Sequence, residues 1–378
     1  MIPVSVMVND EGTVSTKIKG SFNKDRPSTF SSDIRPIVFW NVTYRCNLNC
    51  KHCYINASPN ASKEELDEED LLAIAKEIIR LNLPLVIFTG GEPLIKKEFW
   101  SLAEVFSEYK RPKVSLSSNG TLLSKEYAKR LKDLGFAYVG VSLDSVKPDV
   151  HDSFRGYKGA FSLTLKGIRN AIDEGLDVGI RTTVTRWNVN EISEMVDFSA
   201  KLGAKRFTLY ILDSIGRGVD ISQDLPTKEQ LKYLADVLIE KSKEYKSRLE
   251  ILVVRGNFFG IYIAKKLSRN EEEMERYLKL LQSQGDCGRK TISIYPDGKV
   301  KPCQFIDRYD IGDLKKERLS DILSTSNPRL LKFIRLSDNL RGPKCSACRF
   351  KHICGGGSRN RAMIINGDFW GDDPLCFV

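Results

Sequence analysis

The feature of this sequence that most constrains its fold is a regular alternation of short apolar runs with amphipathic stretches. Each apolar run has the length of a β-strand, and the stretches between them carry apolar residues at helical spacing, as at Leu71, Ala75, Ile78 and Ile79. Such β/α units in series predict a parallel sheet with helices outside it. The predicted strands are residues 37–44, 83–89, 113–118, 137–143, 178–184 and 206–212.

Six units are fewer than the eight of a closed barrel, which usually needs more chain than residues 37–215 provide. We therefore expect an α/β fold whose main body is a partial (β/α)6 barrel of the TIM type. In such folds the chemistry takes place at the carboxyl ends of the strands, because the loops that carry functional residues meet there.

The rest of the chain divides into three segments by its pattern. Residues 1–36 are predicted to be an N-terminal extension, with a small hairpin that turns at residues 9–12. Residues 216–286 look mostly helical, with one strand-like run at 249–254, and are predicted to be a connector. Residues 287–378 change to short strands, turns and cysteines, so we expect a small metal-binding domain there.

Composition and charge exclude several classes of protein. The chain has 378 residues, 41% of them hydrophobic, which is enough for the cores of two domains. It has no apolar run of 18 residues and no basic, apolar leader, so we expect a cytoplasmic protein without a membrane span. The net charge of +10 is scattered, as on a solvated surface, and would also attract acidic partners or a substrate with carboxylates. No nucleic-acid-binding motif accompanies it, so nucleic acid is not an expected partner. The sequence does not indicate an oligomeric state.

Nine cysteines fall into two groups: three lie at residues 46–53, six lie after residue 286, and none lies between. In a cytosolic chain, such tight groups indicate metal ligands rather than disulfides. The first group has the spacing Cys46-x3-Cys50-x2-Cys53, directly after the first predicted strand. A cubane iron–sulfur cluster normally takes four thiolates, so three leave one iron open to a small molecule. The alternatives are reduced core cysteines, which the polar surroundings disfavour, and a zinc site with His52 as fourth ligand.

Further motifs follow at or just after the next three predicted strands. They are Thr89-Gly90-Gly91-Glu92-Pro93, then Ser117-Ser118-Asn119-Gly120, then Ser142-Leu143-Asp144, and shortly afterwards Arg155. Each motif alone is a weak signal. In this order, and behind the cysteine spacing, they resemble the radical S-adenosylmethionine (SAM) superfamily.

This resemblance implies a [4Fe–4S] cluster held by Cys46, Cys50 and Cys53, whose open iron binds the amino and carboxylate groups of SAM. Reductive cleavage of SAM would yield a 5′-deoxyadenosyl radical, with an electron donor such as ferredoxin or flavodoxin as partner. His52 and His151 are expected to be packing residues. By the same resemblance, the SAM-binding residues are Gly90, Gly91 and Glu92 at the amino group, Ser117 and Asn119 after the third strand, Ser142 and Asp144 at the ribose and carboxylate, and the Arg155 fork at the carboxylate.

The C-terminal cysteines follow the pattern Cys287-x15-Cys303, then Cys345-x2-Cys348-x5-Cys354, then Cys376. This pattern resembles the SPASM extension of radical SAM enzymes, which carries auxiliary [4Fe–4S] clusters. The resemblance implies that Cys345, Cys348, Cys354 and Cys376 hold one complete auxiliary cluster, and that Cys287 and Cys303 belong to an inner site. Ser358 stands where the family often has a further cysteine, so the inner site has a serine or another ligand, or does not form. A zinc ribbon is the alternative, which the N-terminal cluster disfavours.

Two segments of the sequence narrow the range of possible substrates. The turn Gly216-Arg217-Gly218 and the tail from Cys354 to Cys376 resemble the subgroup of radical SAM enzymes in haem biosynthesis, which implies oxidative decarboxylation or loss of a tetrapyrrole propionate. Arg217, Arg181 and Tyr210 lie near strand ends and are candidate substrate contacts, although each could equally support the barrel.

Two other functions remain open on the sequence. The first is radical modification of a ribosomal peptide or a protein side chain. The 36 residues before the first strand are too few for a peptide-recognition domain, although such a unit can be a separate protein. The second is a non-catalytic iron–sulfur carrier, which the SAM-contact motifs disfavour because a carrier needs no open iron.

Overall fold

The computed structural model describes residues 1–9, 35–109, 112–282 and 287–378. The strands of these residues form one sheet in the order β10-β9-β8-β1-β2-β3-β4-β5-β6-β7. Every neighbouring pair from β8 to β7 is parallel, and β9 and β10 are antiparallel to their neighbours. The strands are β1 Ile37–Asn41, β2 Leu85–Thr89, β3 Lys113–Ser118, β4 Val139–Ser142, β5 Val178–Val184, β6 Arg206–Ile211, β7 Glu250–Val254, β8 Thr291–Ile294, β9 Lys299–Lys301 and β10 Gly312–Asp313.

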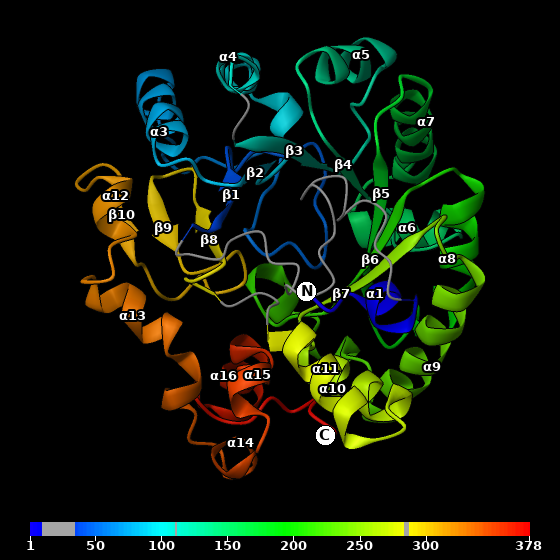
Figure 1. Cartoon of the computed structure of the whole chain (residues 1–378). Helices are drawn as coiled ribbons and strands as arrows, with labels where there is room; N and C mark the ends of the chain where they lie inside the picture. Colours follow the sequence, from blue (N-terminus) through cyan, green and yellow to red (C-terminus); the bar gives the residue numbers. More distant parts are fainter. Residues whose placement is uncertain (10–34, 110–111, 283–286) are drawn as a thin grey trace.

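The six predicted strands correspond to β1–β6, and the α/β partial-barrel prediction is confirmed. Helices lie around the outside of the curved sheet, as Figure 1 shows. The sheet also continues beyond the predicted six strands, since β7 pairs with β6 and β8 pairs with β1. The helices are α1 Val4–Asn9, α3 Glu68–Arg80, α4 Glu98–Ser107, α5 Lys125–Asp133, α6 Pro148–Arg155, α7 Ala160–Asp173, α8 Ile192–Lys201, α9 Lys228–Glu244, α10 Asn257–Leu267, α11 Glu271–Gln282, α12 Leu319–Ile322, α13 Pro328–Ile334, α14 Pro343–Ala347, α15 Lys351–Cys354 and α16 Arg359–Asn366.

Helix α3, in the outer layer, shows how the local sequence determines where a helix begins and which of its faces is buried. The Asp67 side chain caps its N-terminus by accepting a hydrogen bond of 2.9 Å from the backbone N–H of Asp70. Its buried face, which includes Leu71 and Ile78, packs towards the strands at helical spacing. On β1, the alternate residue Trp40 points to the same layer and stacks on Phe88 of β2, with ring centroids 5.8 Å apart. Ile37 and Phe39, which alternate with Val38 and Trp40 along β1, face the inside of the barrel.

The N-terminal segment differs from its prediction. Residues Val4–Asn9 form helix α1 rather than the first strand of a hairpin, and the second predicted strand lies outside the described residues. Ile2 pairs instead with Val253 of β7, through backbone hydrogen bonds of 2.7 and 3.0 Å. The hairpin prediction was wrong for residues 4–9 because burial against β7 and α9 outweighs the strand propensity of valine.

The C-terminal segment contributes β8, β9 and β10 to one end of the sheet, and its helices α12 and α13, drawn in orange in Figure 1, lie beside that end. Helix α15 contacts both α10 and α11, so this segment packs directly on the barrel. Across the described part of the chain, no helix is long and apolar enough to cross a membrane.

Candidate functional site

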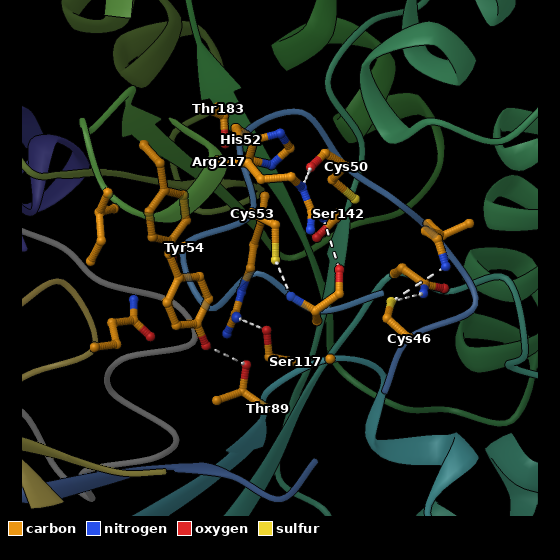
Figure 2. Close-up of a pocket in the computed structure, with 18 of the residues that line it drawn as sticks. Cys46, Cys50, His52, Cys53, Tyr54, Thr89, Ser117, Ser142, Thr183 and Arg217 are labelled. Atoms are coloured by element: carbon orange, nitrogen blue, oxygen red, sulfur yellow. Dashed lines mark hydrogen bonds between the residues drawn. The ribbon is translucent and has the colours of Figure 1, made fainter. Parts of the chain in front are cut away.

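The three N-terminal cysteines line one pocket at the carboxyl ends of the parallel strands. Cys46, Cys50 and Cys53 lie in the loop after β1, and the pocket has a volume of about 160 Å³. Figure 2 shows the three sulfur atoms with Ser117, from the end of β3, and Ser142, from the end of β4. The arrangement agrees with the expectation that the chemistry lies at this end of the strands. Of the predicted SAM-binding residues, Gly90, Gly91, Ser117, Asn119, Ser142 and Arg155 line this pocket.

The surroundings of the three thiols suit thiolate ligands. The backbone N–H of Leu48 donates to Cys46 Sγ at 3.5 Å, and that of Ala57 donates to Cys53 Sγ at 3.3 Å. Burial raises the pKa of Cys46 to about 12, so a bound cation is needed to keep it ionised at neutral pH. Three sulfurs around one pocket, each with a hydrogen-bond donor, fit a cluster with one open iron.

His52 does not take the place of a fourth ligand in this arrangement. Its ring stacks on Phe154, with centroids 4.2 Å apart and planes at 11°. Burial lowers its pKa well below the ordinary value, and its Nδ1 has no hydrogen-bond partner. Within the residues that the structure describes, no group of three or more His, Cys, Asp or Glu side chains is placed to hold a metal ion. These contacts agree with the expected packing role.

The two glycines after β2 allow the chain to approach the segment that leads into the cysteine loop. Gly90 has a φ of +126°, and a Cβ there would lie 2.7 Å from the carbonyl oxygen of Thr43. A Cβ on Gly91 would overlap the carbonyl group of Arg45. The backbone N–H of Gly91 donates to Thr43 O at 2.8 Å. The motif therefore joins the end of β2 to the cysteine loop, and any side chain at Gly91 would separate them.

Glu92 lies behind the pocket wall rather than on its surface. The side chain is fully buried and accepts hydrogen bonds from Ser118 Oγ at 2.9 Å and from the Asn119 backbone N–H at 2.8 Å. Burial raises its pKa to about 7. Glu92 is absent from the pocket lining and ties the end of β2 to the end of β3. The Glu92 carboxylate is thus bonded to the end of β3, and the predicted contact of the Gly-Gly-Glu edge with the SAM amino group stays a prediction.

Asp144 and Arg155 form a buried ion pair beside Cys50. The two closest atoms, Arg155 Nη2 and Asp144 Oδ2, are 2.6 Å apart, and Arg155 Nη1 donates to Cys50 Sγ at 3.7 Å. Asp144 also accepts from the backbone N–H of Thr183 at 2.8 Å and does not line the pocket. Asp144 therefore orients Arg155, which reaches the pocket, and a direct contact of Asp144 with SAM stays a prediction.

Arg217 holds the cysteine loop, a role that its sequence position did not predict. Its Nε donates to the carbonyl oxygen of Cys50 at 2.7 Å, and its Nη2 donates to that of Ala57 at 2.8 Å. Figure 2 shows this side chain beside Cys50. Its backbone N–H also donates to Cys53 O at 3.0 Å. Two nitrogens of the guanidinium therefore hold the loop, while Arg217 also lines the pocket, and its predicted contact with a substrate carboxylate stays a prediction.

A second, larger cavity of about 390 Å³ opens next to the first. Its apolar wall is made by alternate residues of three strands, which share the inner face of the sheet. These are Ile37 and Phe39 of β1, Leu85 and Ile87 of β2, and Leu252 and Val254 of β7.

The charged side chains that line the second cavity in the described parts of the chain all have the same sign. Six basic side chains line it, and no Asp or Glu is among its lining residues in the described parts of the chain. The basic residues are Arg181, Arg206, Arg255, Arg289, Lys290 and Arg359.

Four residues line both cavities and form the boundary between them: Arg181, Tyr210, Gln304 and Phe305. The sequence analysis singled out Arg181 and Tyr210 but missed Gln304 and Phe305. The sequence signal that could have indicated them is their position, one and two residues after Cys303. Phe305 lies 6.2 Å from the Tyr210 ring, between centroids, and the Arg255 guanidinium lies 4.9 Å above the Phe305 ring.

Comparison with known proteins identifies the family. The model for the radical SAM superfamily matches residues 40–199, and one described as an iron-sulfur cluster-binding domain, SPASM, matches residues 286–349. Fe-coproporphyrin III synthase of Methanosarcina barkeri is 33% identical over 371 residues, which cover 95% of this chain and 92% of that protein. The chain belongs to the radical SAM superfamily.

This radical SAM enzyme has further relatives in sequence and in fold. Pre-heme d1 synthase of Dinoroseobacter shibae is 30% identical over 352 residues, which cover 91% of this chain and 86% of that protein. The structure of Streptococcus suis SuiB bound to precursor peptide SuiA has a TM-score of 0.73 and 18% identity, and the match covers 91% of this chain and 76% of that one. The last likeness shows the fold alone. Together, these matches confirm the predicted superfamily and the SPASM domain, and they support [4Fe–4S] clusters and SAM as cofactors.

In the SPASM domain of this radical SAM enzyme, four cysteines approach one another. The thiol of Cys376 interacts electrostatically with those of Cys345, Cys348 and Cys354. The backbone N–H groups of Gly356 and Gly357 donate to Cys354, as a thiolate ligand requires. Burial raises the pKa of Cys354 to about 12. This set fits the predicted outer auxiliary cluster.

Cys287 and Cys303 form a separate pair on the wall of the second cavity, joined by a hydrogen bond between their thiols. The radical SAM enzyme uses Ser358, the predicted substitute ligand, elsewhere. The Ser358 hydroxyl donates to Asp213 and accepts from the Arg361 backbone N–H at 3.2 Å, so it caps helix α16. Ser358 therefore does not fit as a ligand of the inner site.

Proposed function

We propose that this enzyme modifies a tetrapyrrole, by oxidative decarboxylation or loss of a propionate, in the second cavity. The observation that carries the proposal is the combination of an apolar strand face with six basic residues and no acidic ones. An apolar ring system with carboxylate arms matches such a site, because the ring buries against the strands while each carboxylate meets a guanidinium. The similarity to two enzymes named for tetrapyrrole products supports the same choice.

The cofactors and the substrate occupy neighbouring cavities in this proposal. When bound, the [4Fe–4S] cluster and SAM supply the 5′-deoxyadenosyl radical that takes a hydrogen atom from the substrate. Cys46, Cys50 and Cys53 hold that cluster, and Arg155 orients the SAM carboxylate. The side chains between the cavities then decide which substrate carbon faces the radical. An electron donor such as ferredoxin or flavodoxin would reduce the cluster.

Arg181 is the basic residue best placed to hold the reacting propionate. Arg206 is paired with Glu250 at 2.9 Å and Arg255 with Asp213 at 2.7 Å. Arg181 has no ion pair with an acidic side chain among the described residues, and its Nη1 donates to the Ser117 hydroxyl. Its charge is therefore available to a substrate carboxylate at the boundary of the two cavities. Tyr210 lies on the same boundary and would contact the ring.

Absorbance titration of the anaerobically reconstituted enzyme with iron-coproporphyrin tests this function. We expect a change in the Soret band and, with SAM and reductant, a product that mass spectrometry shows to have lost propionate carboxyl groups. Arg181→Ala should weaken binding by roughly 30- to 1000-fold, because a charge-assisted contact in a partly dry site contributes about 2–4 kcal/mol. Arg186→Ala is the matched control, since Arg186 is exposed and lines neither cavity.

The competing function is the modification of a peptide. The fold is similar to that of SuiB bound to its precursor peptide, which is a reason to test this function too. That likeness concerns the fold only. An unchanged Soret band at high micromolar iron-coproporphyrin, together with a mass shift on a co-encoded peptide, would replace the tetrapyrrole proposal.

A further inference from the structure

A group of buried charged side chains lies where the C-terminal segment meets the barrel, and its charges do not balance. Arg255 pairs with Asp213 at 2.7 Å, and Arg361 pairs with Asp373 at 2.6 Å. These two pairs use both carboxylates of the group. The guanidinium of Arg359, a residue that is 1% exposed, has no carboxylate of its own there. Arg359 has no ion pair with an Asp or Glu within the described residues. A buried cation without an anion is strongly unfavourable, so the surroundings of Arg359 must provide negative charge.

The Arg359 side chain is held between the two loops that carry Cys354 and Cys376. Its Nη2 donates to the carbonyl oxygen of Gly356, two residues after Cys354. Its Nη1 donates to Phe369 O at 3.0 Å and to Gly371 O at 2.7 Å, in the segment before Cys376. Carbonyl oxygens satisfy these N–H groups but do not neutralise the charge. The Nε–H is buried without any partner.

Besides Asp373, which is already paired with Arg361, the negative charges that act on Arg359 are those of the cysteines. The thiols of Cys345 and Cys354 lie near enough to interact electrostatically with Arg359. A [4Fe–4S] cluster in its usual oxidised form, held by four thiolates, carries a net charge of about −2, and net charge is one of the factors that set its reduction potential. The unpaired guanidinium and the predicted cluster therefore complement each other.

We propose that Arg359 is the fixed counter-charge of the outer auxiliary cluster and raises its reduction potential. The inference rests on the proposed cluster at Cys345, Cys348, Cys354 and Cys376. Reduction adds one electron to the cluster, and a cation fixed in a low-dielectric interior stabilises the more negative form more than the less negative one. Arg359 is thus a positioning and tuning residue for electron transfer, and it takes no part in SAM cleavage.

A redox titration of the intact, reconstituted enzyme, followed by electron paramagnetic resonance, tests this assignment. Addition of SAM changes the signal of the open-iron cluster only, so the SAM-insensitive signal reports the auxiliary cluster. For Arg359→Gln we expect the equilibrium constant for one-electron reduction to fall at least tenfold, which is 59 mV or more. Arg359→Lys keeps the charge and should shift less than half as far.

The matched control is Arg349→Gln. Arg349 directly follows Cys348 but is exposed, so water screens its charge and the constant should change less than twofold. An Arg359→Gln protein with full iron content and an unchanged potential would overturn the proposal. So would an equal shift in Arg349→Gln, or loss of the cluster from both Arg359 variants, because the hydrogen bonds rather than the charge would then be decisive. If the wild-type protein binds no iron through these cysteines, the failure belongs to the proposed cluster, and iron analysis shows it separately.

Discussion

Arg155 and Arg217 hold the middle cysteine of the radical SAM loop from two sides. Arg155 donates to the Cys50 sulfur at 3.7 Å, and Arg217 donates to the Cys50 carbonyl oxygen at 2.7 Å. Each comes from a different part of the chain, since Arg155 ends α6 and Arg217 follows β6. At the scale of single residues, the loop is therefore positioned by side chains that lie more than 100 residues away.

Substitution of Arg217 should impair the cluster rather than the substrate site. Arg217→Ala removes two charged hydrogen bonds to the cysteine loop, each of which contributes about 1.5–3 kcal/mol. We expect iron retention in the open cluster, and 5′-deoxyadenosine formation without substrate, to fall by roughly tenfold or more. Iron analysis and chromatography measure the two quantities. Full iron and normal SAM cleavage combined with weak tetrapyrrole binding would instead show that Arg217 acts as a substrate contact.

The pKa of Glu92 makes stability depend on pH in a defined direction. Burial raises this pKa from 4.5 to about 7, so between these values the folded protein keeps a proton that the unfolded chain releases. The free energy of unfolding should therefore fall as pH rises from 4.5 to 7, by about 3 kcal/mol from this group. Glu92→Gln should lose that dependence in denaturant titrations at pH 5 and pH 8. Glu126→Gln, at an exposed position, is the control and should follow the wild type; parallel profiles for Glu92→Gln would contradict the assignment.

At the scale of elements, the ends of neighbouring parallel strands are joined in two ways. One is a close backbone contact that leaves no room for a side chain, and the other is a set of hydrogen bonds to a buried glutamate. The turn after β2 runs against the segment from Thr43 to Arg45, which leads out of β1 into the cysteine loop. Glu92 then joins this turn to the end of β3 through Ser118 and Asn119. The pocket wall is thus a continuous chain of hydrogen bonds across three neighbouring strands.

Gly91→Ala tests this linkage. The added methyl group would overlap the Arg45 carbonyl group, which is backbone and cannot rotate away, so the loop must shift. We expect the open cluster to lose most of its iron, as measured per chain after reconstitution. Gly135→Ala is the comparison, because a Cβ there meets nothing within 4 Å, and its φ of +76° disfavours alanine without any close contact. Equal iron content in the two variants would show that the close approach is not required.

At the scale of the whole molecule, the SPASM domain closes one side of the second cavity. Cys287 and Cys303 lie on its wall, and the segment after Cys303 reaches the boundary with the SAM pocket through Gln304 and Phe305. Asp213, at the end of the barrel, contacts Ser358 of the SPASM domain. The barrel and the cysteine-rich segment therefore line both cavities together.

Iron content measures how many clusters this assembly holds. One open cluster and one complete auxiliary cluster should give about eight irons per chain. About twelve would show that the inner site at Cys287 and Cys303 also fills, with further ligands from outside the cysteines. Stoichiometric zinc with about four irons would contradict the iron–sulfur assignment of the SPASM domain. Cys376→Ala should lower the count by about four while leaving some SAM cleavage.

The sequence by itself determined the six β/α units and the cysteine spacing, because both follow local periodicity and short motifs. It also predicted a close backbone approach after β2, since such an approach leaves no room for any residue other than glycine. Only the tertiary structure decided that β7 and β8 extend the sheet, that Arg217 holds a loop 160 residues or more away, and that Glu92 and Asp144 lie behind the pocket wall. The physical reason is that strand pairing, burial and the choice of hydrogen-bond partner depend on residues that are distant in the chain, which no local pattern encodes.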